Sequence, residues 1–266
     1  MTRPAFVDLA VLIEGNVCEL LLAMGAAGGG DQRADDEITW TVGGSPIGYH
    51  NAVVRCTVGS DTRGGELVEE WLTELRSHAV PGSWHLAPTM RPTRLPEMLV
   101  AAGFQDAGEE PAMAMALADL RAAPTPSGLD IGLVTDAGDL GGYRSVLAAG
   151  FGEGPKEADW VASIYATIGV GDAGRWRHLL GRVEGEPVAT ASVLLTGPTA
   201  GIYFVSTRPD LRRRGLGAAI THQAMVEAAD AGAAYAVLGS SPMGQGIYER
   251  LGFRTVFPYR LFEWEP

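Results

Sequence analysis

The stretch RRRGLGAA, residues 212–219, places three arginines directly before two glycines, at the start of a helical pattern. An apolar run, GIYFV at residues 201–205, precedes it, so the pattern changes from strand to loop to helix. The first turn of a helix leaves backbone N–H groups without partners, and the helix dipole adds partial positive charge there. Gly215 and Gly217 let a ligand oxygen approach the backbone, and arginines add forked donors. The stretch therefore predicts a diphosphate site.

A solvated helical turn that happens to contain arginine is the alternative. Cations at a helix N-terminus oppose the dipole, and each glycine costs a helix about 1 kcal/mol relative to alanine. A bound anion would compensate for both unfavourable effects, so they favour the anion-site interpretation. The stretch is not a P-loop, because no Gly-Lys-Ser/Thr follows, and it is not a dinucleotide fingerprint, because G-x-G-x-x-G is absent.

The amino-acid composition limits the kinds of protein that this chain can be. The 266 residues are 46% hydrophobic, enough for one or two domains, and carry a net charge of −12. The acidic balance disfavours nucleic-acid binding and suits a cationic substrate such as an amine. Cys18 and Cys56 lack metal-ligand spacing, so we expect reduced structural thiols and no metal. No signal peptide and no window of 18 uninterrupted apolar residues is found, so we expect a cytoplasmic protein without a membrane partner.

Turn residues mark the organisation of the chain. The segment AAPTPSG, residues 122–128, is the best linker candidate. We therefore expect domains at residues 1–121 and 128–266, joined by a linker at residues 122–127. The expected elements of the first domain are helices at Ala5–Met24 and Gly65–His78 and strands at Ile38–Val42, Ala52–Val58 and Trp84–Ala87.

The second domain has the predicted order β-α-α-β-β-β-α-β-α-β, which suits an α/β domain on one partly antiparallel sheet. Its helical, aromatic-bearing part lies between the first two strands, around Phe151 to Trp176. The other expected elements are strands at Asp130–Val134, Trp176–Val183, Val188–Leu195, Gly201–Val205, Tyr235–Leu238 and Thr255–Glu263, and helices at Leu216–Ala231 and Met243–Leu251.

A faint internal repeat links the two domains. LVAAGF, residues 99–104, resembles YERLGF, residues 248–253, and a strand-like segment follows each. Two copies of one fold is the preferred interpretation, with a Gly-Phe coincidence as the alternative.

Two motifs then carry a family resemblance. Arg212-Arg-Arg-Gly215-Leu-Gly217, after a strand, resembles the R/Q-x-x-G-x-G/A acyl-CoA motif of the GCN5-related N-acetyltransferase (GNAT) family. IYERLGF, residues 247–253, resembles that family's second motif, and the resemblance covers about Leu129 to Pro266. It implies an acyl-CoA N-acyltransferase fold, α/β with a mixed sheet, in two tandem copies. It also implies an enzyme that transfers the acetyl group of acetyl-CoA to a primary amine of a small molecule or peptide.

The resemblance implies an opening between the strands at Gly201–Ser206 and Tyr235–Ser240. The pantetheine arm would pair with the backbone near Phe204, and the diphosphate would lie on amides from Arg213 to Ala218, with Arg212 beside it. Tyr248 matches the family's general acid, and a structural tyrosine that packs the last helix is the alternative. The expected cofactor-binding residues are Phe204, Val205, Ser206, Arg212, Arg213, Arg214, Gly215, Leu216, Gly217, Ala218, Ser240 and Tyr248.

The general base stays open. Some family members carry a glutamate on the strand before the CoA loop, and here that strand has no acid. A water relay through backbone carbonyls or through Ser240 and Ser241 is one option. An acid from the helical segment is another, the candidates being Glu153, Glu157 and Asp159, although each suits a surface charge better. We expect His222 to be structural.

The first domain departs from the motif. GSDTRGGEL, residues 59–67, stands where a CoA loop should lie and loses R-x-x-G-x-G. Leu99 takes the position that Tyr248 has in the second domain, which puts a hydrocarbon in place of the acid. We expect a degenerate GNAT-like domain that does not turn over and that could complete the acceptor pocket. An unrelated α/β cap is the alternative.

Direct attack by a neutral amine is expected, because no cysteine lies near either motif. Two other functions stay open: a non-catalytic acyl-CoA-binding sensor, and an acyltransferase that uses a longer acyl chain. The protein is expected to act as a monomer or a homodimer.

Overall fold

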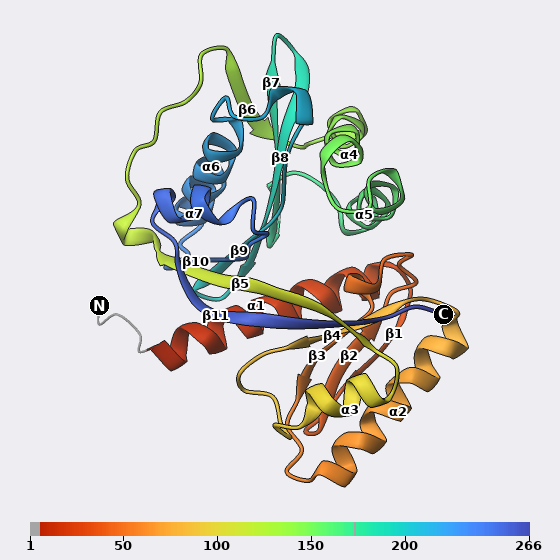
Figure 1. The fold of residues 1–266 in the computed structure, drawn as a ribbon. Helices are drawn as coiled ribbons and strands as arrows, with labels where there is room; N and C mark the ends of the chain where they lie inside the picture. Colours follow the sequence, from red (N-terminus) through yellow and green to blue (C-terminus); the bar gives the residue numbers. More distant parts are fainter. Residues whose placement is uncertain (1–5, 173) are drawn as a thin grey trace. The chain divides into compact units, whose positions relative to one another are not determined.

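The computed structural model describes residues 6–172 and 174–266, and Figure 1 follows its elements along the chain. The chain divides into two compact units, each made of two separate segments. Unit 1 comprises the chain up to Asn16 together with Ala112–Val256, and unit 2 comprises Val17–Pro111 together with Phe257–Pro266. Each unit has its own buried apolar core.

Unit 1 contains a mixed sheet with the strand order β5-β10-β9-β8-β7-β6. Strands β9 and β10 run parallel, and the other pairs run antiparallel. A parallel pair needs a crossover connection, which α6 supplies. The strands are β5 (Gln105–Ala116), β6 (Leu129–Leu133), β7 (Trp176–Val183), β8 (Glu186–Thr196), β9 (Thr199–Thr207) and β10 (Tyr235–Gly239).

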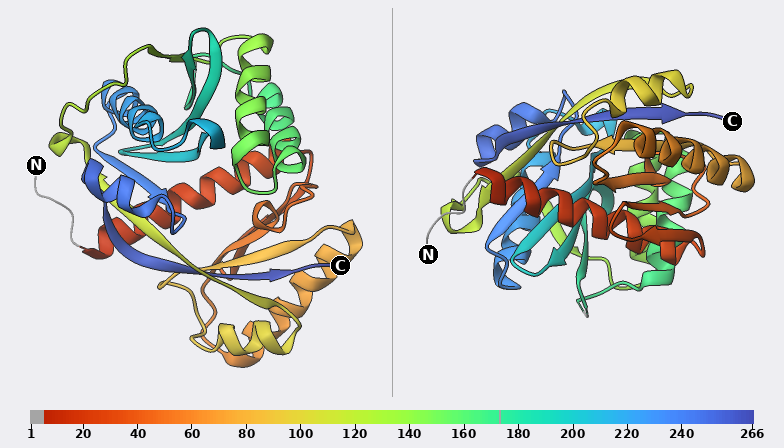
Figure 2. Two further views of the ribbon diagram at one scale, coloured as in Figure 1. Left: turned by 45° about the horizontal axis from the view of Figure 1, so that its top comes forward. Right: turned by 90° about the horizontal axis from the view of Figure 1, so that it is seen from below.

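Helices cover both faces of this sheet. Figures 1 and 2 show α4 and α5 on one face and α6 and α7 on the other. The apolar side of α6 packs on the sheet, with Leu216, Ile220 and Met225 in the core cluster. The helices are α4 (Ala137–Gly150), α5 (Pro155–Ile168), α6 (Leu216–Asp230) and α7 (Gln245–Leu251), with single 3₁₀ turns at Leu117–Asp119 and Pro209–Leu211.

The order expected from residue 128 onward is confirmed. The chain between β6 and β7 forms two helices, α4 and α5. Asp136 caps α4, because its side chain accepts a hydrogen bond from the amide of Asp139 at 2.9 Å. The length of β5 was not foreseen, because its first half, QDAGEE, is polar and mostly exposed. Such a segment lacks the alternating apolar pattern by which strands are found.

Unit 2 contains the strand order β1-β2-β3-β4-β11, in which β3 and β4 run parallel. The expected apolar face of α2 is buried, with Trp71 and Leu75 at its centre. The elements are β1 (Asp31–Ala34), β2 (Ile38–Val42), a 3₁₀ turn (Gly48–His50), β3 (Ala52–Cys56), α2 (Asp61–His78), β4 (Gly82–Leu86), α3 (Leu95–Ala101) and β11 (Arg254–Trp264).

The internal repeat is confirmed at the two Gly-Phe segments. Helices α3 and α7 each end at a glycine in the left-handed conformation, with φ of 97° and 104°. In both, the amide of the next phenylalanine donates to the carbonyl five residues earlier, at 2.9 and 3.0 Å. The matching positions are Leu99 with Tyr248, Gly103 with Gly252, and Phe104 with Phe253.

The unit boundaries differ from the linear division expected at residues 121 and 128. Strand β5 follows α3, yet it pairs along Ala112–Ala116 with β10 in unit 1. Strand β11 follows α7, yet it pairs along Arg260–Trp264 with β4 in unit 2. A strand belongs to the sheet with which its backbone forms hydrogen bonds. The side-chain pattern of a strand does not specify which strand will be its neighbour.

Helix α1 (Phe6–Ala27) is the most apolar helix in the chain. Its window Leu9–Ala27 has a mean hydropathy of 1.7 and is by length and composition sufficient to cross a membrane, although 44% of the window is buried in the structure. Buried Asn16 lies within it and donates to Thr196 Oγ1 at 2.7 Å and to the Leu194 carbonyl at 3.2 Å. The Tyr203 hydroxyl donates to Asn16 Oδ1. These contacts fix the start of α1 on the sheet of unit 1, as in a core helix.

We expect Asn16→Ala to lower the free energy of unfolding by about 2–3 kcal/mol, because it leaves the Tyr203 hydroxyl buried without its acceptor. Urea unfolding measures the change. Val11→Ala is the matched control, since Val11 is 55% exposed on the same helix, and it should change stability by no more than about 0.5 kcal/mol. An Asn16→Ala protein as stable as the wild type would contradict this role.

Candidate functional site

Strands β9 and β10 pair over a short stretch and then separate. Their register is Tyr235 with Thr199, Ala236 with Ala200 and Val237 with Gly201. Beyond it β9 continues to Thr207 and β10 to Gly239 without further pairing to each other within the described chain. Backbone groups on these edges are open to a ligand that adds itself as a strand. The separation expected at this point of the sheet is therefore confirmed.

A β-bulge lies where β9 leaves β10. The register of β9 against β8 shifts there and leaves Phe204 and Val205 opposite a single residue. Phe204 has φ 51°, and its carbonyl accepts from Thr190 Oγ1 at 3.0 Å. Ser206 Oγ is buried and has no hydrogen-bond partner among the described residues. The bulge thus changes the direction of the backbone at Phe204, Val205 and Ser206, the three residues predicted to contact the pantetheine arm.

The start of α6 is open. The helix begins at Leu216 with no side-chain cap and no acid in its first turn, so its first amides have no acceptor within the helix. Gly215, with φ 80°, occupies a conformation that other residues rarely adopt. A Cβ at Gly217 would lie 3.4 Å from Thr207 Oγ1, so the chain is closely packed there. This geometry suits an anion at the helix start.

The three arginines have different surroundings. Arg212 donates to the Gly150 carbonyl at 3.0 Å and to the Thr207 carbonyl at 3.4 Å, which joins the loop to the end of α4. Arg213, with φ 60°, and Arg214 are exposed, and neither makes a hydrogen bond or salt bridge within the described chain. Arg212 therefore supports the loop, and the other two keep their donors available.

Tyr248 and Ser240 gather at the end of β10. A Cβ at Gly244 would lie 3.0 Å from the Tyr248 ring and 3.5 Å from Ser240 Oγ. The Tyr248 ring packs edge-on against Phe253, with ring centroids 6.0 Å apart. Burial raises the pKa of Tyr248 to about 12, so its hydroxyl carries a proton at neutral pH. The Ser240 hydroxyl donates to the Ser241 carbonyl at 2.8 Å.

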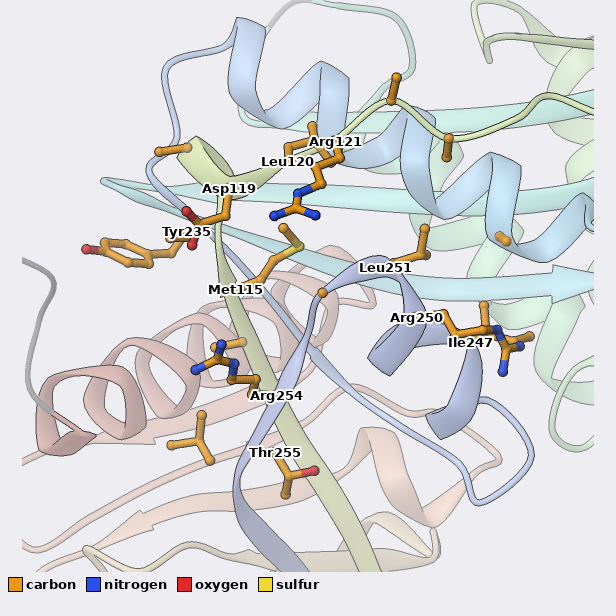
Figure 3. A pocket seen from close by; sticks show the side chains of 18 of the residues that line it. Met115, Asp119, Leu120, Arg121, Tyr235, Ile247, Arg250, Leu251, Arg254 and Thr255 are labelled. Carbon is orange, nitrogen blue, oxygen red and sulfur yellow. The ribbon is translucent and has the colours of Figure 1, made fainter.

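A cavity of about 1200 Å³ lies beside these elements. Figure 3 shows its lining, from β5, the chain after β5, α6, α7 and the start of β11. Of the predicted cofactor residues, Gly215 and Ala218 line it. Tyr248 does not, although its neighbour Ile247 does. The predicted residues on β9 and at Ser240 lie outside the lining. The cavity therefore extends from the start of α6 to α7.

The corresponding helix start in unit 2 is closed. The side chain of Ser60 caps α2 by accepting from the Arg63 amide at 3.1 Å, and Asp61 adds an acid to the first turn. The guanidinium of Arg63 is neutralised by three glutamates and lowers the pKa of Glu37. These partners are Glu37 at 2.7 Å, Glu66 at 3.0 Å and Glu70 at 2.7 Å. The departure of GSDTRGGEL from the motif thus coincides with a capped helix start and a paired arginine.

Residues 175–255 match a family model described as an acetyltransferase (GNAT) domain. The chain carries a GNAT domain. The matched segment contains the separating strands, the arginine-glycine loop and α7. A GNAT domain implies acyl transfer that depends on acyl-CoA. A search of curated proteins found no match.

Solved structures resemble the chain over most of its length. A GCN5-related N-acetyltransferase from Kribbella flavida is 19% identical with a TM-score of 0.67, over 92% of this chain and 94% of that one. A conserved protein of unknown function from Staphylococcus epidermidis is 19% identical with a TM-score of 0.66, over 89% and 94%. A tandem GNAT protein from the clavulanic acid biosynthesis pathway is 14% identical with a TM-score of 0.55, over 89% and 78%. The expected tandem GNAT fold is confirmed.

Two of the three acids considered as bases are committed to structural contacts. Glu157 is buried, and its Oε2 accepts from the amide of Glu153 at 3.0 Å. Asp159 pairs with Arg144. His222 Nε2 lies 2.9 Å from the Arg121 carbonyl, so it holds the segment after β5 against α6 in a structural role, as expected. Among the residues described, no group of three or more His, Cys, Asp or Glu could hold a metal.

A buried polar cluster lies between the GNAT sheet and α4 and α5. Ser192 Oγ lies 2.7 Å from the Tyr143 hydroxyl and 2.8 Å from His178 Nδ1. The His178 ring stacks on Tyr165, with centroids 3.7 Å apart, and on Trp176 at 5.6 Å. Sequence reasoning missed this cluster, because its members are far apart in the chain. The only signal was a histidine and a serine on neighbouring strands of an apolar pattern.

Burial lowers the pKa of His178 to about 3. The unfolded chain binds a proton near pH 6.5, while the folded chain does not do so until about pH 3. The neutral imidazole therefore stabilises the fold fully above pH 6.5, and the stabilisation is lost as pH falls, by about 1.4 kcal/mol per pH unit.

We expect His178→Gln to reduce the fall in unfolding free energy between pH 7 and pH 5, measured by urea unfolding at both pH values. Buried His85, whose pKa is also lowered to about 3, should maintain the remaining slope. Val11→Ala is the control and should keep the wild-type slope, because it removes no titratable group. An unchanged slope in His178→Gln would show that His178 titrates alike in both states.

Proposed function

We propose that this protein is an acetyl-CoA-dependent N-acetyltransferase that acetylates a primary amine of a small molecule or peptide. The observation that carries the proposal is the separation of β9 from β10 beside the uncapped start of α6. The structural neighbours include a GCN5-related N-acetyltransferase and a tandem GNAT protein, which supports the same activity. The net charge of −12 is consistent with a cationic acceptor.

The cofactor is proposed to run along the open edge of β9. Its pantetheine amides pair with the backbone of Val205 and Ser206, since the Phe204 carbonyl already accepts from Thr190. Its diphosphate binds the amides of residues 213–218, with Arg213 and Arg214 adding charge. Leu216 contributes through its backbone, because its side chain is buried in the core. Arg212 and Ser240 position the two sides of the site.

The proposed reaction is direct attack. The neutral amine forms a C–N bond at the thioester carbonyl, the C–S bond breaks, the departing thiolate takes a proton, and the nitrogen releases one proton to solvent. Tyr248 is proposed as the acid, because its raised pKa keeps the proton in place at neutral pH. The desolvation that raises this pKa also makes a thiolate beside it more basic, which keeps the two groups matched.

Unit 2 is proposed to bind no acyl-CoA. Its Ser60 cap and its neutralised Arg63 occupy the groups that an anion would need. Leu99 replaces the tyrosine hydroxyl with a hydrocarbon.

Calorimetric titration with acetyl-CoA should give one site per chain. Gly215→Glu should abolish it, because a side chain at φ 80° is strained and the added carboxylate repels phosphate. Gly65→Glu is the matched control on α2 of unit 2, where a Cβ meets open space, and it should leave the titration unchanged. Two sites would mean that unit 2 also binds, and no binding by folded wild-type protein would refute the CoA interpretation.

Tyr248→Phe should lower kcat about 100-fold while acetyl-CoA affinity changes less than about twofold, because a proton donor is lost without a binding group. Steady-state kinetics with a panel of amines and calorimetry measure the two effects. Tyr235→Phe is the control, since it removes a hydroxyl elsewhere in the same unit. Equal rates for Tyr248→Phe and wild type would exclude the acid role, and a wild type that binds acetyl-CoA but acetylates no amine would favour the sensor alternative.

A further inference from the structure

Phe204 has an unusual backbone conformation for a residue within a strand. Its φ of 51° lies in the left-handed region, which a bulky side chain rarely adopts. The other non-glycine residues with positive φ are Ala79 at the end of α2, Glu184 in the turn between β7 and β8, and Arg213 in the loop before α6. Among the residues that the structure describes, Phe204 is therefore the only one of this kind inside a strand. Such a conformation costs free energy and persists only where neighbouring groups hold it.

Contacts to the ring and to the backbone hold Phe204 in this conformation. Its buried ring packs against Phe151 and edge-on against Tyr165, with centroids 5.5 and 5.9 Å apart. Its carbonyl accepts a hydrogen bond from Thr190 Oγ1 at 3.0 Å. Thr190 lies on β8, is fully buried and pairs in register with Ser206. A bulge interrupts the hydrogen-bond ladder, and here a side chain of the neighbouring strand bonds the backbone of the bulge.

The bond from Thr190 also sets the direction of the next amide. A trans peptide group is planar, and its carbonyl and N–H point in opposite directions. The Phe204 carbonyl points toward Thr190 on β8. The Val205 N–H belongs to the same peptide group and therefore points away from β8. That direction leads to the opposite edge of β9, along which β9 continues without pairing to β10 within the described chain.

We propose that Thr190 is a positioning residue for acyl-CoA: by holding the Phe204 carbonyl, its hydroxyl keeps the Val205 N–H directed at the open edge of β9. The inference rests on the proposed function, in which the cofactor pairs with the backbone of Val205 and Ser206. Thr190 acts through the peptide group and does not itself contact the cofactor. A threonine hydroxyl that served only the stability of the fold would have no effect on the cofactor affinity of folded protein.

Thr190→Val removes the hydroxyl and keeps a side chain of similar shape. It should weaken acetyl-CoA binding about tenfold, measured by calorimetry, because the Val205 N–H is no longer held toward the cofactor. Thr190→Ser keeps the donor and should bind acetyl-CoA within about twofold of the wild type. In steady-state kinetics, Thr190→Val should raise the KM for acetyl-CoA and leave the KM for the amine unchanged.

Ser192→Ala is the matched control. Ser192 is a buried residue on the same strand, and its hydroxyl bonds the side chains of Tyr143 and His178. This variant should lose stability and keep the wild-type affinity for acetyl-CoA. Unchanged affinity in Thr190→Val, or an equal loss in Thr190→Ser or in Ser192→Ala, would overturn the inference while leaving the proposed function intact. Failure of folded wild type to bind acetyl-CoA would overturn both.

Hydrogen exchange of the wild type, followed by NMR, supplies a test that needs no variant and that decides if Thr190→Val does not fold. The Val205 amide should exchange about tenfold more slowly when acetyl-CoA is bound, because the cofactor then accepts its hydrogen bond. An exchange rate that bound acetyl-CoA leaves unchanged would show that this N–H does not face the cofactor, and the inference would be wrong.

Discussion

The separation of β9 from β10 is the constraint on which the rest of unit 1 depends. The two strands share a parallel register only as far as Gly201 and Val237. Parallel strands need a crossover helix, and here that helix, α6, begins beside the free edge of β9. A bulge at Phe204 and Val205 turns the β9 backbone at the same point. The end of pairing between β9 and β10 therefore leaves an open edge on β9, beside the uncapped start of α6 in the same unit.

The two halves of the chain show how little is needed to close such a site. Both have a parallel strand pair joined by a helix and a short helix that ends at a left-handed glycine before a phenylalanine. They differ at the helix start, where α6 has Gly215 and α2 has Ser60. A serine cap consumes one free amide, and three glutamates consume the charge of Arg63. At the start of α2 these groups are satisfied within the chain, so this part of the fold does not need a ligand.

The segment after β5 illustrates the difference between sequence pattern and position. By composition, AAPTPSG is a linker, and the structure gives it no helix or strand. It nevertheless belongs to unit 1, and the residues before it are held on α6 by His222. Its residues Ala122, Ala123 and Pro124 line the cavity of about 1200 Å³, together with Leu120 and Arg121. A connection between repeats can in this way become part of a binding surface.

The sequence by itself determined the local structure: the strand, loop and helix around RRRGLGAA, the order of elements after residue 128, the Gly-Phe repeat and the apolar face of α2. These follow from side-chain periodicity and from glycine, which act over a few residues. Only the tertiary structure decided that β5 pairs with β10 and β11 with β4, that Ser192 joins Tyr143 to His178, and that Arg121 meets α6 and α7 at one cavity. Such contacts join residues far apart in the chain, and a strand's own pattern does not specify which free edge it will pair with.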